Sequence, residues 1–234
     1  MSRMAVRGVA IGVAALLLVA GPAMAGPGGT QDRESQAAMT PDEALRLLRE
    51  GNERFASGLT VRRDLEQQVK ATSSGQFPFA VVLGCIDSRV PPELVFDTGI
   101  GDVFSSRTAG NAADDEILGG LEFATKVSGA RLIVVLGHTQ CGAVKGACDG
   151  VRLGHLTETL ALLGPALAAS KDVPGPHDSS NPAYVQRVTE ENVRLTARSL
   201  LKNSEILREL AEQGRLRVVP ALYDVASGRV SFLE

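Results

Sequence analysis

The sequence lacks several features that mark common classes of protein. It has no basic cluster, and its 24 Lys and Arg residues are outnumbered by 27 Asp and Glu residues, which gives a net charge of −3. A mildly acidic chain of this kind is a poor candidate for nucleic-acid binding. It has no internal repeat. Beyond its first 25 residues, no apolar run reaches the about 20 residues that a membrane-spanning helix needs.

The first 25 residues have the pattern of a secretory signal peptide. Arg3 and Arg7 precede an apolar run over residues 9–20, and small residues end the segment at Ala23 and Ala25. An uncleaved membrane anchor is the alternative, and a lipoprotein is excluded because no Cys follows the apolar run. We expect cleavage after Ala25, which removes 25 of the 234 residues and leaves 209 in a periplasmic or secreted protein without a membrane segment.

Cysteine is scarce, with only Cys85, Cys141 and Cys148 in the chain. An odd number of cysteines is unusual in a secreted protein, because they cannot all pair. Two interpretations are open. Either one disulfide forms and leaves a free thiol, or two thiolates bind a metal ion that protects them from oxidation.

Residues 26–38 are rich in Gly, Gln and Ser and predict a flexible lead-in, and residues 39–234 predict a single domain. Thr40, Pro41 and Glu43 form a capping box with proline at the first helical position, which predicts the start of a helix. Gly51 predicts its end.

The rest of the chain alternates apolar strand patterns with helical patterns. Strands are predicted over residues 77–84, 103–106, 131–137, 216–223 and 229–233, and helices over 60–68, 114–128, 143–148, 155–169, 183–203 and 205–213. Continuous apolar runs such as FPFAVVLG and RLIVVLG are typical of parallel strands buried on both faces. The sequence therefore predicts an α/β fold with a mostly parallel central sheet flanked by helices and an N-terminal helical arm.

Chemically active residues follow two of the predicted strands. Cys85 comes directly after the strand over residues 77–84, and His138 and Cys141 follow the strand over residues 131–137. Sites in parallel sheets form at the carboxyl ends of strands. Thiolate and imidazole are preferred zinc ligands, and two Cys plus one His with an open position is a known catalytic set. The alternative is a Cys85–Cys141 disulfide beside an incidental histidine.

Asp87 and Arg89 lie within four residues of Cys85. A neighbouring Arg lowers the pKa of a carboxyl group and keeps it a hydrogen-bond acceptor. Such an Asp can orient a water molecule on the metal, or bind the metal itself as a fourth ligand and close the site. A surface ion pair is the alternative, and would contribute little.

The combination of Cys85-x-Asp87-Ser88-Arg89 with His138-x-x-Cys141 resembles the two signature motifs of the β-carbonic anhydrases. The stretch RTAGN over residues 107–111 and the stretch GHTQCGAVKG over residues 137–146 are also similar to that family. The resemblance extends from about Pro41 to Tyr223, and it favours the plant-like type.

The resemblance implies a role for each matching residue. Cys85, His138 and Cys141 would hold one Zn²⁺ per subunit, and Asp87 and Arg89 would form the catalytic dyad. Substrate-binding positions of the plant-like type would be Gln76, Phe104, Phe123 and Gly142, with Phe123 standing where a Tyr is common. Val82 stands where another type has a Trp that forms a regulatory bicarbonate site, so we expect no such site. Arg107 would be structural.

The activity that the resemblance implies is the reversible hydration of carbon dioxide to bicarbonate and a proton by a zinc-bound hydroxide. Hydrolysis of carbon disulfide or carbonyl sulfide at the same site remains an alternative, as does a non-catalytic zinc-binding protein. The family further implies a homodimer or homotetramer with pockets at subunit boundaries, where the N-terminal helix contacts a partner. No proton shuttle is identified, since His155 and His177 are candidates by residue type only, and we expect Cys148 to pack in the core.

Overall fold

The computed structural model describes residues 28–233, so the predicted signal peptide lies outside the described residues. Its core is a sheet in the order β2-β1-β3-β4-β5. The strands are β1 (Ala80–Gly84), β2 (Val103–Arg107), β3 (Leu132–His138), β4 (Arg217–Tyr223) and β5 (Val230–Phe232). The first four are parallel, and β5 is antiparallel to β4. The predicted α/β fold with a mostly parallel sheet is confirmed.

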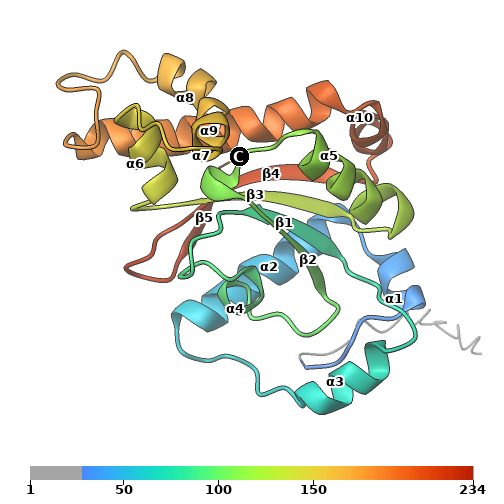
Figure 1. Ribbon diagram of the computed structural model, residues 1–234. Coiled ribbons are helices and arrows are strands. Elements are labelled where there is room, and N and C mark those ends of the chain that lie inside the picture. Colours follow the sequence, from blue (N-terminus) through green and yellow to red (C-terminus); the bar gives the residue numbers. More distant parts are fainter. Residues whose placement is uncertain (1–27, 234) are drawn as a thin grey trace, which may run out of the picture.

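Helices cover both faces of the sheet (Figure 1). They are α1 (Arg33–Ala38), α2 (Pro41–Ala56), α3 (Leu65–Thr72), α4 (Pro92–Val95), α5 (Asp115–Glu122), α6 (Gly142–Cys148), α7 (Leu156–Ala161), α8 (Gly164–Ala169), α9 (Pro182–Asn203) and α10 (Glu205–Glu212). A short 3-10 helix, η1, spans Ala109–Asn111, and a π-helical turn, η2, spans Phe123–Val127.

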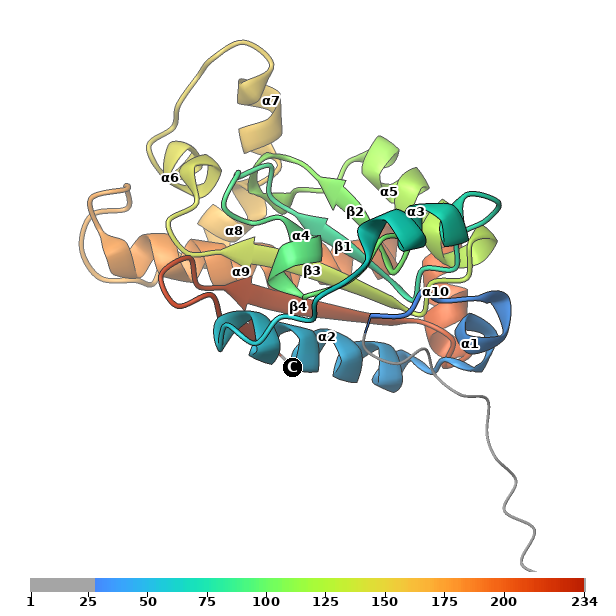
Figure 2. The same ribbon diagram turned by 90° about the horizontal axis from the view of Figure 1, so that it is seen from below.

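Alternate residues of the central strands build two separate cores. On one face, Val82 and Val134 pack with Leu48 of α2 and with Phe96, which follows α4. On the other face, residues such as Val81 and Ile133 pack with α5, α9 and α10. Figure 2 shows α2 lying along the sheet when the molecule is seen from below. Because β1 and β3 are buried along their whole length, their carboxyl ends are held firmly side by side.

The structure differs from the sequence-based expectation at the lead-in. Residues 33–38 were expected to be flexible, but they form helix α1, with a capping box between Asp32 and Ser35. The side-chain amide of Gln36 is buried and donates to the carbonyls of Pro78 (2.7 Å) and Ser128 (2.8 Å). These bonds to distant backbone anchor the segment on the domain.

Three helix boundaries also differ. The helix that starts at Pro41 does not end at Gly51 but continues to Ala56. A Cβ atom at Gly51 would lie 1.9 Å from the carbonyl oxygen of Phe96, so this glycine allows close helix packing instead of ending the helix. The helix expected over residues 60–68 begins only at Leu65, after the capping side chain of Asp64. The helix expected over residues 155–169 is divided into α7 and α8.

Candidate metal centre

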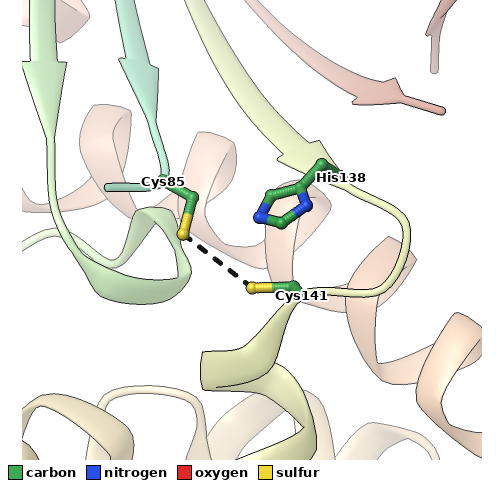
Figure 3. Close-up of side chains that lie close together, drawn as sticks. All are labelled: Cys85, His138 and Cys141. Carbon is green, nitrogen blue, oxygen red and sulfur yellow. Dashed lines mark hydrogen bonds between the residues drawn. The ribbon is translucent and has the colours of Figure 1, made fainter. Parts of the chain in front are cut away.

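Three side chains meet at the carboxyl ends of the neighbouring strands β1 and β3 (Figure 3). Cys85 follows β1, His138 is the last residue of β3, and Cys141 is the N-cap of α6. One ligand atom from each, two sulfurs and one ring nitrogen, lie within 4.8 Å of one another. The parallel pairing of β1 with β3 therefore brings together residues that are 53 positions apart in the chain, as the strand-end argument predicts.

The centre lies in a largely apolar environment. Cys85, His138 and Cys141 are 3%, 0% and 1% exposed. The two cysteines belong to a third apolar cluster that includes Val144, Leu163 and other residues of α6 to α9. A low local dielectric strengthens electrostatic interactions between these groups and any charge placed among them.

The histidine ring is oriented for a metal. Nδ1 of His138 lies 2.9 Å from the carbonyl oxygen of Thr139, and because a carbonyl can only accept, Nδ1 carries the proton. Nε2 then has a free lone pair, is buried and has no hydrogen-bond partner. A buried polar atom without a partner destabilises a protein, and a cation between this nitrogen and the two sulfurs would satisfy it.

The distance between the two sulfurs suits a pair of metal ligands. They lie 3.9 Å apart, and all three cysteines of the chain, each within the described part, are free. The Cys85–Cys141 disulfide considered above is therefore absent. Two sulfurs at 2.3 Å from a tetrahedral zinc ion would be about 3.8 Å apart, so the spacing fits this ion.

The two thiols are hydrogen-bonded to each other. Their mutual hydrogen bond is the main cause that lowers the pKa of Cys85, and it raises the pKa of Cys141. The pair therefore already favours one thiolate, which is the form that binds metal.

Asp87 and Arg89 form a pair next to the cluster. Asp87 Oδ1 accepts from the backbone N–H and Nε of Arg89, both at 2.9 Å, and Oδ2 accepts from Nη2 at 2.8 Å. These bonds hold the pKa of Asp87 well below its usual range. Oδ2 is 3.8 Å from Nε2 of His138. The carboxylate thus borders the cluster while it is engaged by Arg89, and the three-ligand group does not include it.

Backbone and side-chain contacts fix the loop that carries Cys85. Arg107 donates to the carbonyl oxygens of Cys85 (2.8 Å) and Asp87 (2.6 Å), in line with the structural role expected for it. The backbone N–H of Gly110 lies 3.4 Å from the sulfur of Cys85 and donates to it. The side-chain amide of Asn192, on α9, holds the carbonyl of Gly110 at 2.8 Å.

The expected substrate-binding residues do not all gather at the metal cluster of this chain. Gly142 is exposed and directly follows Cys141. Gln76 is exposed and precedes β1, so it lies toward the opposite end of that strand from Cys85. Phe104 pairs in register with Val81, four residues before Cys85, or about 13 Å at 3.3 Å per residue. Phe123 packs edge-on against Phe104, with ring centroids 6.3 Å apart.

The remaining candidates are placed as follows. His155 and His177 are exposed, and the ring of His177 stacks on Tyr184 with its Nε2 bonded to a backbone carbonyl. Cys148 is partly buried and packs against the apolar cluster around the metal site, as expected of a core residue. Burial raises the pKa of its thiol to about 11. Within residues 28–233, no helix is long and apolar enough to span a membrane.

Several residues that support the centre have little or no signal in the sequence. Gly110 belongs to the RTAGN stretch, whose resemblance to the family is the only signal for it in the sequence. Asn192 and Asp224 have no local signal, because each makes its contact with a segment more than 80 residues away.

The known proteins to which this chain is similar are carbonic anhydrases. A family model described as carbonic anhydrase matches residues 80–230. Carbonic anhydrase 2 of Mycobacterium tuberculosis is 36% identical over 190 residues, covering 81% of this chain and 91% of that protein. The crystal structure of a β-carbonic anhydrase from Aspergillus fumigatus is 27% identical, with a TM-score of 0.63, and the match covers 82% of this chain and 90% of that one. Structures described as tetrameric β-carbonic anhydrases from Sordaria macrospora include a chain that is 26% identical, with a TM-score of 0.61 and coverage of 72% and 90%.

Proposed function

The chain belongs to the β-carbonic anhydrase family and catalyses the reversible hydration of carbon dioxide to bicarbonate and a proton, and from this premise we propose that its metal is zinc. One Zn²⁺ per subunit would be held by Cys85, His138 and Cys141. The observation that carries the proposal is the convergence of two sulfurs and an unpartnered imidazole nitrogen within 4.8 Å. Two thiolates and one imidazole are a donor set that zinc prefers.

When bound, zinc would supply an activated water, since it lowers the pKa of a water ligand to about 7. The chain's own residues then orient the reactants. The carboxylate of Asp87 is kept ionised by Arg89, so it acts only as an acceptor. At 3.8 Å from Nε2 of His138, it can accept a hydrogen bond from the attacking group and direct a lone pair at the carbon of carbon dioxide. We therefore assign Asp87 and Arg89 as the catalytic pair.

A turnover assay tests this substrate against its analogues. Stopped-flow measurements with carbon dioxide, carbon disulfide and carbonyl sulfide should show rapid hydration of carbon dioxide by the zinc-loaded protein. Zinc content, measured on the same sample, should be one ion per chain. Hydrolysis of the sulfur compounds with negligible hydration of carbon dioxide would contradict the assignment, and so would activity that does not follow zinc content.

We further propose that the protein is a homodimer or homotetramer. Strand β2 lies at the edge of the sheet, and an unpaired edge invites contact with another chain. Phe123, beside this edge strand, is 51% exposed, although aromatic side chains are usually covered. If a second copy covers this region, Gln76, Phe104 and Phe123 of one subunit can complete the substrate pocket of the other.

We propose that the mature protein is periplasmic or secreted and begins at Gly26. The basic start, the apolar run and the small residues that end at Ala25 support this assignment. Intact-mass measurement of the protein recovered from the periplasmic fraction or the medium should give the mass of residues 26–234. A protein that keeps residues 1–25 and remains with the membranes would contradict the proposal.

A further inference from the structure

We propose that Thr139 and Asp224 form a latch that positions the imidazole of His138 for the metal. Both are positioning residues, since neither contributes a ligand atom to the group of Cys85, His138 and Cys141. The inference rests on the proposed zinc site. It involves the turn after β4.

Thr139 has three polar groups, which together form hydrogen bonds with four partners. Its backbone N–H donates to the carbonyl of Tyr223 at 2.9 Å. Its hydroxyl donates to Oδ1 of Asp224 and accepts from the backbone N–H of Val225, both at 3.1 Å. Its carbonyl accepts the Nδ1 proton of His138 at 2.9 Å. The position of that carbonyl decides which way the imidazole faces.

Asp224 is itself fixed within the turn that joins β4 to β5. Its Oδ1 also accepts from the backbone N–H of Ala226 at 3.1 Å, and its Oδ2 accepts from the hydroxyl of Ser227 at 2.7 Å. A carboxylate held on both oxygens can present a lone pair to Thr139 in only one direction. The turn therefore provides a rigid anchor from a segment 85 residues away in the chain.

The backbone after His138 gives the latch a physical reason. Gln140 has a φ of 58°, a conformation that is strained for a residue with a side chain. The peptide between Thr139 and Gln140 carries the carbonyl that binds His138. The hydrogen bonds of the hydroxyl fix the side chain of Thr139. They thereby hold the adjacent peptide, so that it cannot rotate to relieve the strain at Gln140. Groups behind a ligating histidine fix its tautomer and ring orientation, and their loss weakens metal binding by about 10- to 100-fold.

The test compares two substitutions at one position. Thr139→Val keeps the shape but removes the hydroxyl, whereas Thr139→Ser keeps the hydroxyl. Thr125→Val is the matched control, because the hydroxyl of Thr125 also donates a hydrogen bond, here to the backbone carbonyl of Leu121 at 2.8 Å, and this buried threonine lies in η2 and not in the metal cluster. Zinc affinity is measured by competition with a chelator, and the visible spectrum of the Co²⁺-substituted protein reports ligand geometry.

We expect Thr139→Val to bind zinc about 10-fold more weakly than the wild type, the lower end of the range for loss of a direct partner, because the carbonyl that contacts His138 is kept, and we expect a shifted Co²⁺ spectrum. Thr139→Ser and Thr125→Val should match the wild type in both measurements. Asp224→Ala should reproduce the loss, and the double variant with Thr139→Val should lose no more than either single variant, because one bond is shared. Asp224→Ala also serves as the test if Thr139→Val does not fold.

Two results would overturn the latch. The first is a folded Thr139→Val variant with wild-type zinc affinity and Co²⁺ spectrum. The second is an equal loss of affinity in Thr125→Val, which would indicate general destabilisation. A wild-type protein that binds no zinc would instead refute the proposed metal, and the latch with it, so the two failures are distinguishable.

Discussion

Replacement of Asp87 by Asn separates catalysis from metal binding and from stability. In the wild type, Oδ2 of Asp87 accepts from Nη2 of Arg89 at 2.8 Å, and Oδ1 accepts two further bonds from the same residue. An amide nitrogen in place of Oδ2 can only donate, so this bond is lost and the negative charge disappears. The shape of the side chain is unchanged, and the three proposed metal ligands are untouched.

The expected magnitudes differ strongly between stability and activity. The side chain of Arg89 is 51% exposed, so loss of the ion pair should lower the free energy of unfolding by only about 0–1 kcal/mol. Loss of a group that orients or accepts a proton in the transition state typically slows a reaction about 100- to 10,000-fold. That range corresponds to about 3–5 kcal/mol in the activation free energy. The effect on kcat/KM should therefore far exceed the effect on folding.

The assay measures stopped-flow carbon dioxide hydration, zinc content and thermal unfolding on the same preparation. Asp178→Asn is the matched control, because Asp178, like Asp87, accepts a backbone hydrogen bond (2.8 Å from Ser180) and a side-chain hydrogen bond (2.5 Å from the Ser180 hydroxyl), but it lies in the loop before α9. The control should keep full activity. If Asp87→Asn retains zinc and its kcat/KM stays within about threefold of the wild type, Asp87 has no part in the mechanism.

Three further predictions concern packing, acid stability and assembly. Gly51→Ala should lower the free energy of unfolding by about 1–3 kcal/mol, because the new Cβ would lie 1.9 Å from a backbone oxygen. Gly119→Ala, at an exposed helix position with nothing within 4 Å, should instead raise it by about 0.5–1 kcal/mol. Urea titrations measure both changes. Burial alone would raise the pKa of Asp97, but hydrogen bonds from two arginines and a backbone N–H lower this pKa overall. The stability that the Asp97 carboxylate contributes is therefore present above about pH 4 and is lost as the pH falls through the lowered pKa. Asp97→Asn should lower the free energy of unfolding at pH 7 by about 3 kcal/mol. Phe123→Asp should lower the mass measured by light scattering toward that of the monomer. Leu153→Asp, which also replaces an exposed apolar side chain, should leave this mass unchanged. Equal masses for the two variants would contradict the proposed interface.

Much of the fold was predictable because its information is local. The run RLIVVLG predicted the buried strand β3, and the residues after it predicted a metal site at the strand end. Parallel pairing then leaves few ways to arrange Cys85 and His138 other than side by side. The cap of α2 was equally clear, because Thr40 and Glu43 are three residues apart.

What the sequence could not reveal depends on contacts between distant segments. Gly51 has the residue type of a helix end, and only its approach to the backbone of Phe96 explains why α2 continues through it. Helix α1 has a composition typical of a flexible segment, yet Gln36 ties it to backbone 42 and 92 residues away. The contact of Thr139 with Asp224 likewise requires the finished sheet.

The central claim is that Cys85, His138 and Cys141 hold a catalytic zinc ion with one open position. X-ray absorption at the zinc edge of the purified protein tests it most directly. We expect two sulfur neighbours at about 2.3 Å and one nitrogen at about 2.0 Å, with one further light ligand from solvent. A shell with no sulfur, or a shell of four protein ligands that includes more than two sulfurs, would contradict it.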